Sequence, residues 1–205
     1  MRNFLIILML SFATTACGPR YVDYFPCHDD GTCKPAVALL PITDCTPSHS
    51  SEVAANEIFQ EIQSDAMHHG ELYFLSPEEL RDGGSAGKID FYTDETQLGN
   101  SFCSADFIVI MELIDQEYSR MGQCKPPVNT TTVSFPAEIL LTLKVRLKVI
   151  DVRPRCPRVV LQEIFTRGYF MPCPDEYDSQ VSTKAYHRFG KSLDNRLEEI
   201  ICTSY

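Results

Sequence analysis

The residues best suited to chemistry in this sequence are its cysteines. The chain contains nine of them. Setting Cys17 aside as part of a different motif leaves an even number, which in an exported chain indicates disulfide bonds. No CxxC pair and no paired Cys/His spacing of a zinc site occurs, so we expect no metal and no cofactor. The eight disulfide candidates are Cys27, Cys33, Cys45, Cys103, Cys124, Cys156, Cys173 and Cys202.

Other reactive side chains form no catalytic pattern. The residues that could serve as general bases are His28, His49, His68, His69 and His187. The sequence has neither a GxSxG nucleophile elbow nor an HExxH pair. We therefore predict no catalytic residues and no enzymatic activity. An exported hydrolase that lacks a familiar motif is kept as an alternative.

Two further motifs are incomplete. Residues 27–33 place an Asp-Asp-Gly turn between two cysteines, but two carboxylates without a distal acid fall short of a calcium loop. A disulfide-closed turn explains this segment better. Residues 82–88 resemble a phosphate-binding loop only superficially, because the spacing is wrong and no Ser or Thr follows Lys88. We predict a surface loop over residues 82–103.

The longest element that must position these residues is a strand over residues 138–151. Its apolar side chains alternate with a set that includes Thr142, Lys144, Arg146 and Lys148. Because successive side chains of a strand point to opposite faces, one face should meet a core. We expect the other face, with its three cations, to be solvated rather than a binding surface.

Neighbouring β-rich runs extend this strand into a sheet. Residues 106–118 and 159–169 precede and follow it, and the three segments most simply form an antiparallel meander. The unbroken apolar run at 36–42 predicts a strand buried on both faces, and residues 72–75 predict a second short strand.

Helices are predicted to cover the apolar face of this sheet. One runs from about Glu52 to Gly70, a brief one opens at Ser76-Pro77, and a terminal one spans residues 183–201 with an apolar stripe. The predicted fold is an α/β (α+β) domain. It consists of a mixed sheet with long antiparallel strands, covered by an amphipathic helix and a C-terminal helix and stapled by disulfides.

The N-terminus has the pattern of an export signal. Arg2 precedes an apolar run that is too short for a membrane-spanning helix of about 20 residues, and small residues then lead to Ala16. Because Cys17 follows, the segment resembles a bacterial lipoprotein signal. That resemblance implies cleavage before Cys17 and acyl chains such as palmitate on its thiol, while Gly18 implies delivery to the outer membrane. An ordinary secretory signal is the alternative.

Length, composition and charge set the domain organisation. The chain has 205 residues, 44% of them hydrophobic, which is enough for one sizeable core. We predict a signal peptide at 1–16, a lipid anchor and tether at 17–35, and a single domain at 36–205. The net charge of −10 argues against a nucleic-acid partner.

The order of elements resembles a recurrent module of the bacterial envelope. An opening strand that ends in Pro41, an amphipathic helix, long antiparallel strands and a closing helix are similar to the N-terminal domain of TolB, to CsgG-type curli-secretion lipoproteins and to outer-membrane lipoprotein activators of penicillin-binding proteins. The whole sequence also resembles a chlamydial envelope lipoprotein of unassigned activity.

This resemblance implies a non-enzymatic lipoprotein that is anchored in the outer membrane and faces the periplasm. Its domain would bind another envelope component, in assembly or in peptidoglycan synthesis. A disulfide-crosslinked structural protein of the envelope is a third hypothesis.

The meander also predicts which cysteines pair. Cysteines just before the first strand and between the second and third fall at one end of the sheet, and those after the first and third fall at the other. The remaining four divide into a local pair and a distant pair. The predicted disulfides are Cys103–Cys156, Cys124–Cys173, Cys27–Cys33 and Cys45–Cys202.

Overall fold

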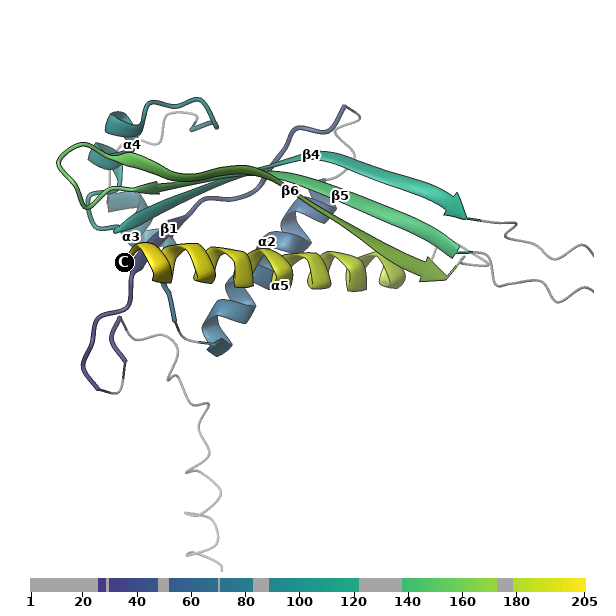
Figure 1. Ribbon diagram of the computed structural model, residues 1–205, viewed down its shortest axis with the longest axis horizontal. Helices are drawn as coiled ribbons and strands as arrows, with labels where there is room; N and C mark the ends of the chain where they lie inside the picture. The colour runs from purple at the N-terminus through teal and green to yellow at the C-terminus, as the bar shows by residue number, and fades with distance from the viewer. Residues whose placement is uncertain are drawn as a thin grey trace, which may run out of the picture.

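The computed structural model describes residues 26–28, 30–47, 52–69, 71–82, 89–121, 138–172 and 179–205. Short strands and helices make up its first half, and three long strands and a long helix follow (Figure 1). The elements in chain order are β1 (Ala36–Leu39), β2 (Thr43–Asp44), α2 (Glu52–His69), β3 (Tyr73–Phe74), α3 (Pro77–Asp82), α4 (Glu95–Ser101), β4 (Phe107–Met121), β5 (Glu138–Asp151), β6 (Arg158–Pro172) and α5 (Ser179–Ser204).

The strands of the described residues form one mixed sheet. Its order is β3-β1-β4-β5-β6, and β2 also pairs with β4. The pairs β3–β1, β1–β4 and β2–β4 are parallel, whereas β4–β5 and β5–β6 are antiparallel. The predicted meander and the predicted α+β class are therefore confirmed.

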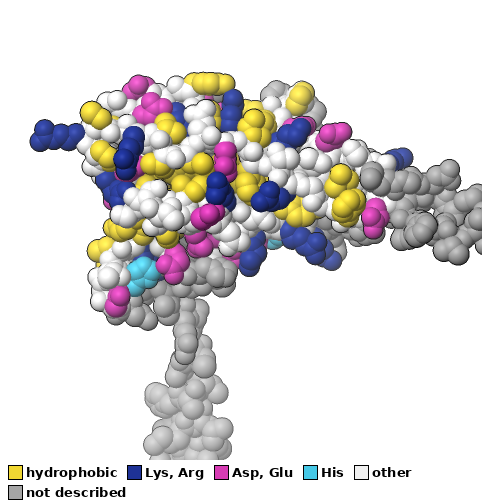
Figure 2. All heavy atoms as spheres, in the orientation of Figure 1, with side chains coloured by type: hydrophobic (Ala, Val, Ile, Leu, Met, Phe, Trp, Pro, Cys, Tyr) yellow, Lys and Arg dark blue, Asp and Glu magenta, His cyan; other side chains and the backbone are white. Residues whose placement is uncertain are grey.

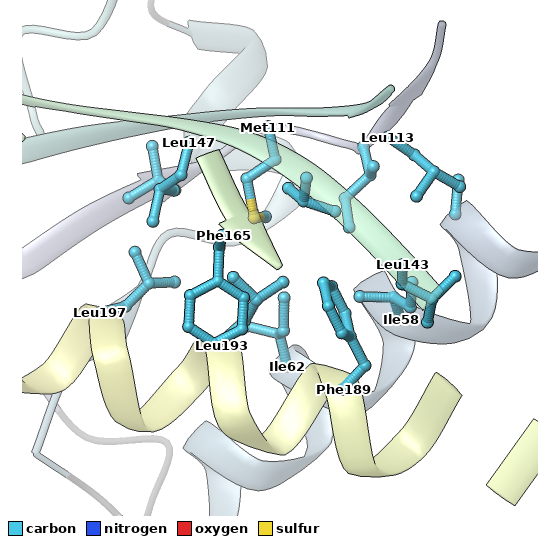
Figure 3. Packing of buried hydrophobic residues seen from close by; sticks show 14 of the residues in the cluster. Ile58, Ile62, Met111, Leu113, Leu143, Leu147, Phe165, Phe189, Leu193 and Leu197 are labelled. Atoms are coloured by element: carbon cyan, nitrogen blue, oxygen red, sulfur yellow. The ribbon is translucent and has the colours of Figure 1, made fainter. Parts of the chain in front are cut away.

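Two helices, α2 and α5, cover one face of this sheet (Figure 1). Their apolar stripes meet the alternating side chains of the meander, so Ile58 and Phe189 lie fully buried in the same cluster as Leu143 (Figure 3). The ring of Phe189 packs edge-on against Phe165 of β6, with the ring centroids 5.5 Å apart. This layer is the main hydrophobic core.

The helices cross closely where α5 has a glycine. A Cβ atom at Gly190 would lie 2.8 Å from Cβ of Glu61 and 3.0 Å from the carbonyl oxygen of Ile58. Beside this crossing, His187 directs one ring nitrogen to the carboxylate of Glu61 and the other to that of Glu57, at 3.4 Å. Absence of a side chain at position 190 thus sets how near α2 and α5 approach.

Local sequence signals determine where the short helices begin. At α3, the amide of Ser76 donates to Oε2 of Glu79 (2.7 Å), and the amide of Glu79 donates back to Oγ of Ser76 (3.3 Å). This reciprocal capping box satisfies two donors at the helix start. At α4, Oδ1 of Asp94 accepts from the amides of Thr96 and Gln97.

The opposite face of the sheet has a second, smaller core at one end. Phe91, Leu98 and Phe102 are buried there against Ile108 and Ile150. The prediction of a surface loop over residues 82–103 is wrong for the part that follows residue 88. Widely spaced apolar residues in a polar segment show no clear period, so this cover is visible only once the sheet beneath it is known.

Arginine fixes the C-terminal end of α5 to the sheet. The carboxylate of Asp151 is buried and accepts bonds from Arg153 (2.9 and 3.0 Å) and Arg158 (3.1 Å). Arg153 also donates to the carbonyls of Ser204 and Tyr205. Burial would raise the pKa of Asp151, but the bonds from Arg153 and Arg158 outweigh it and hold that pKa below its ordinary value.

A hydroxyl network fixes the other end of α5. The hydroxyl of Tyr186 lies 3.0 Å from that of Tyr118 on β4, and Nε2 of Gln116 donates to it at 2.9 Å. Burial, together with the neighbouring Tyr118, raises the pKa of Tyr186 well above its ordinary value.

Across the described segments, no helix has both the length and the apolar character to cross a membrane.

Candidate interaction face

Among the described residues, one part of the sheet is left uncovered. It lies on the face of β4, β5 and β6 opposite α2 and α5, beyond the end that residues 89–105 cover. We call it the open face. Strand alternation and the register place on it Glu112, Asp115, Glu117 and Ser119 of β4, Leu140, Thr142, Lys144 and Arg146 of β5, and Gln162, Ile164, Thr166, Gly168 and Phe170 of β6.

Large apolar side chains are exposed at two places along this open face, where Tyr92 and Ile164 lie beside Arg146 and, six residues farther along β6, Phe170 lies opposite Leu140. Tyr92, Ile164 and Phe170 are 77%, 59% and 60% exposed, and Leu140 is paired directly across the ladder with Phe170. Gly168 leaves space for the side chain of Leu140, because a Cβ atom at position 168 would lie 3.1 Å from Cδ1 of Leu140. We call Tyr92, Leu140, Ile164 and Phe170 the open-face patch.

The charges beside this patch are paired with one another. Arg146 forms an ion pair with Glu112, its guanidinium carbon lies 4.4 Å from the ring centroid of Phe91 and 5.2 Å from that of Tyr92, and its Nη1 donates to the Tyr92 hydroxyl (2.9 Å). Nζ of Lys144 lies 2.7 Å from Asp115. The hydrogen bonds that Arg146 donates to Glu112 and Lys144 donates to Asp115 raise the pKa values of Arg146 and Lys144.

The ion pairs of Arg146 and Lys144 determine which kind of partner the open face could attract. A surface whose cations are neutralised by neighbouring carboxylates has little attraction for anions, while its exposed rings and aliphatic groups gain from being covered. Hydrophobic, basic and acidic side chains are interspersed over the side of the molecule that the space-filling view shows (Figure 2). The open face therefore presents exposed apolar side chains beside charges that are already paired.

Lys148 does not belong to this solvated surface. It is only 4% exposed, its Nζ donates to the carbonyl of Phe91 (3.3 Å), and it lies 2.6 Å from Oε1 of Glu95. The hydrogen bond from Lys148 lowers the pKa of Glu95. The prediction of a water-facing triplet of cations is therefore wrong for Lys148, because residues 89–105 fold over this end of the strand.

The cysteines are only partly brought together. Cys27 and Cys33 face each other in an antiparallel bridge with their sulfur atoms 3.7 Å apart, close to the predicted pairing but without a bond. Cys103 and Cys156 lie at the same end of the sheet, as predicted, and both thiols are free. Whether either pair oxidises stays a prediction. Cys17, Cys124 and Cys173 lie outside the described residues.

The predicted Cys45–Cys202 disulfide is wrong. The amide of Cys45 donates to the carbonyl of Leu113, whereas Cys202 lies on the last turn of α5, which Arg153 fastens beside Phe107. Phe107 and Leu113 are six residues apart along β4, or about 20 Å. A disulfide needs Cα atoms within about 7 Å. The error arose because the extra strand β2 carries Cys45 farther along β4 than one short strand would.

The histidines that the structure describes lie in separate places. Both ring nitrogens of His187 face glutamates of α2, so this side chain joins two helices. His28 lies in the loop between Cys27 and Cys33. His49 and the side chains of His68 and His69 fall outside the part described. Within that part, no group of three or more His, Cys, Asp or Glu side chains is arranged to hold a metal ion.

Sequence reasoning found the strands but missed the open-face patch. The alternation of Gln162, Ile164, Thr166, Gly168 and Phe170 was available as a signal. Whether these side chains are exposed depends on which face of β6 is covered by α5. The sequence of β6 does not determine that face, because both of its faces carry apolar residues.

The fold and the face define a small α+β protein whose sheet is covered by helices on one side and carries exposed apolar side chains among paired charges on the other. The chain belongs to a family of unknown function (DUF7499), whose match extends over residues 24–205. No curated protein matches the sequence.

Comparison with solved structures finds similar chains at low identity. A hypothetical protein from Chlamydia trachomatis is 16% identical, with 83% of this chain and 99% of that chain covered at a TM-score of 0.51. This confirms the chlamydial resemblance at the level of fold alone. Lipoprotein GNA1162 from Neisseria meningitidis is 8% identical (80% and 99% covered, TM-score 0.42), and the LpoB C-terminal domain from Salmonella enterica is 10% identical (68% and 86% covered, TM-score 0.40). Scores below 0.5 establish no relation in function.

Proposed function

We propose that this protein is a non-enzymatic lipoprotein of the bacterial envelope whose domain binds another envelope protein through the open-face patch. The observation that carries the proposal is the joint exposure of Tyr92, Ile164 and Phe170 on one sheet face with locally paired charges. Exposed apolar side chains gain free energy when a partner covers them, which supports a binding role for this face.

The envelope part of the proposal is supported by the N-terminal sequence. Cys17 follows an export signal at the position where bacterial lipoproteins carry their acyl chains. Two or more acyl chains make a durable anchor, since each buried methylene contributes about 0.8 kcal/mol. Replacing Cys17 with Ser should move the protein from the detergent phase to the aqueous phase. Unchanged partitioning would refute the anchor.

The binding part is tested by site-specific photocrosslinking in intact cells. A photoreactive amino acid at position 164 or 170 should capture one discrete partner that is not a second copy of this chain, whereas the same residue at Val53 should not. Val53 is a matched control because it is also exposed (68%) but lies on α2, on the other side of the sheet.

Substitution completes the test. Ile164→Ser and Phe170→Ser should weaken capture of that partner at least tenfold without changing thermal stability, because both side chains are exposed in the single chain. Equal capture by wild type, both variants and Val53→Ser would show that the open-face patch is not the binding surface.

A further inference from the structure

β6 is the outermost strand of the sheet. It forms a long ladder with β5, from Arg158 opposite Asp151 to Pro172 opposite Glu138. Within the described ranges no strand pairs with its other side. A long exposed edge is open to pairing with another chain, and proteins commonly protect such edges with several charges or with a covering segment.

From Leu161 onward, past the register shift between Val149 and Ile150, the backbone groups that β6 offers are those of its even-numbered residues. Val152 donates to the carbonyl of Asp106 (2.9 Å), so the even-numbered residues of β5 bond to β4 and the odd-numbered ones bond to β6. From Leu161 onward, the odd-numbered residues of β6 are their hydrogen-bonding partners, so the even-numbered residues point away from β5. Consistently, the carbonyl of Thr166 points outward, where Nη1 of Arg167 reaches it at 3.1 Å.

The charge pattern of this edge is self-complementary. Glu163 and Arg167 are the only charged residues between Val159 and Met171. When two β6 strands run antiparallel about a two-fold axis at Phe165, each Glu163 lies opposite Arg167 of the second copy. A shift by one residue would put side chains on the wrong faces, and a shift by two would separate the opposite charges.

The same register also brings apolar groups together. Ile164, 59% exposed on the open face, falls opposite Thr166 of the second copy and diagonal to the second Ile164. Diagonal neighbours lie about 7–8 Å apart, within reach of long side chains. The same two-fold axis therefore pairs Glu163 with Arg167 on the sheet face that α5 covers, and it covers Ile164 on the open face.

We propose that this protein forms a two-fold dimer by antiparallel pairing of two β6 strands about Phe165. The carboxylate of Glu163 already accepts from Arg196 (3.1 and 3.2 Å), and a carboxylate has room for a second guanidinium. Arg167 lies 4.5 Å from the ring centroid of its own Phe165 and reaches the second copy by side-chain rotation. The pairing closes on itself and joins both open faces into one surface.

Light scattering on the full-length protein in detergent and reducing agent tests this dimer. Wild type should have twice the chain mass. Thr166→Pro removes an outward N–H while leaving the ladder with β5 intact, so it should halve the mass. Thr166→Val keeps the N–H and should remain dimeric, with circular dichroism confirming that both variants fold. A monomeric wild type, or a dimeric Thr166→Pro, would overturn the proposal.

Charge exchange tests the register. Arg167→Glu alone and Glu163→Lys alone each place like charges opposite one another and should be monomeric. Mixed in equal amounts, they restore opposite charges at both positions and should form a heterodimer. A mixture that stays monomeric would overturn the two-fold axis at Phe165. None of these outcomes depends on Cys17 or on the envelope partner, so the dimer and the proposed function can fail separately.

Discussion

The crossing of α2 and α5 predicts an unusual response to a glycine substitution. In an open helix, Gly190→Ala would stabilise the protein by about 1 kcal/mol, because alanine has the higher helix propensity. Here the new methyl group would lie 2.8 Å from Cβ of Glu61 and 3.0 Å from a backbone oxygen of Ile58. Carbon atoms prefer about 3.5–4.0 Å, so the helices must separate.

Overpacking of this kind costs about 1–3 kcal/mol, and more where backbone must move. Because a backbone oxygen is one of the close atoms, we expect the steric cost to exceed the gain in propensity and to leave a net loss of about 1–2 kcal/mol. For a domain of this size, that corresponds to a fall in Tm of roughly 2–8 °C.

Thermal unfolding followed by circular dichroism measures this shift. Asn195→Ala is the matched control, since Asn195 is exposed on the same helix and the change should leave Tm equal or slightly raised. If Gly190→Ala raised Tm as an ordinary helix substitution does, α2 and α5 would not approach as closely as the structure has them, and the reasoning would be refuted.

Three further outcomes are expected. Asp151→Asn should lower the free energy of unfolding by about 3 kcal/mol at pH 7, because it removes the negative charge of the buried carboxylate that pairs with Arg153 and Arg158. Since the folded-state pKa of Asp151 is held low, this contribution is complete above about pH 4 and is lost as pH falls through that pKa, so urea unfolding of variant and wild type should converge in acid. Phe91→Ala should cost about 3–5 kcal/mol in the same assay, because Phe91 is buried beneath Arg146; a loss below 1 kcal/mol would contradict the second core. Mild oxidation should join Cys27 to Cys33, and peptide mapping that finds Cys27 bonded elsewhere would disprove this pairing.

The long meander could be predicted because its pattern is local. Residues 138–151 alternate strictly, and their neighbours are separated from them by turn-forming segments, so antiparallel pairing is the simplest arrangement. The capping residues of α3 were equally readable, since Ser76 and Glu79 satisfy each other within one helical turn. These features require no knowledge of distant contacts.

The interaction face could not be predicted because it depends on what covers each half of the sheet. Lys144, Arg146 and Lys148 follow one another on a single strand face and have the same chemistry, yet Lys148 is buried under residues 89–105 while the other two border an exposed patch. The segment that makes this difference carries isolated apolar residues without a period. The exposed side chains that matter most, Ile164 and Phe170, alternate like those of any half-buried strand. They become a candidate binding surface only because α5 packs on the opposite face of β6 and leaves them without cover.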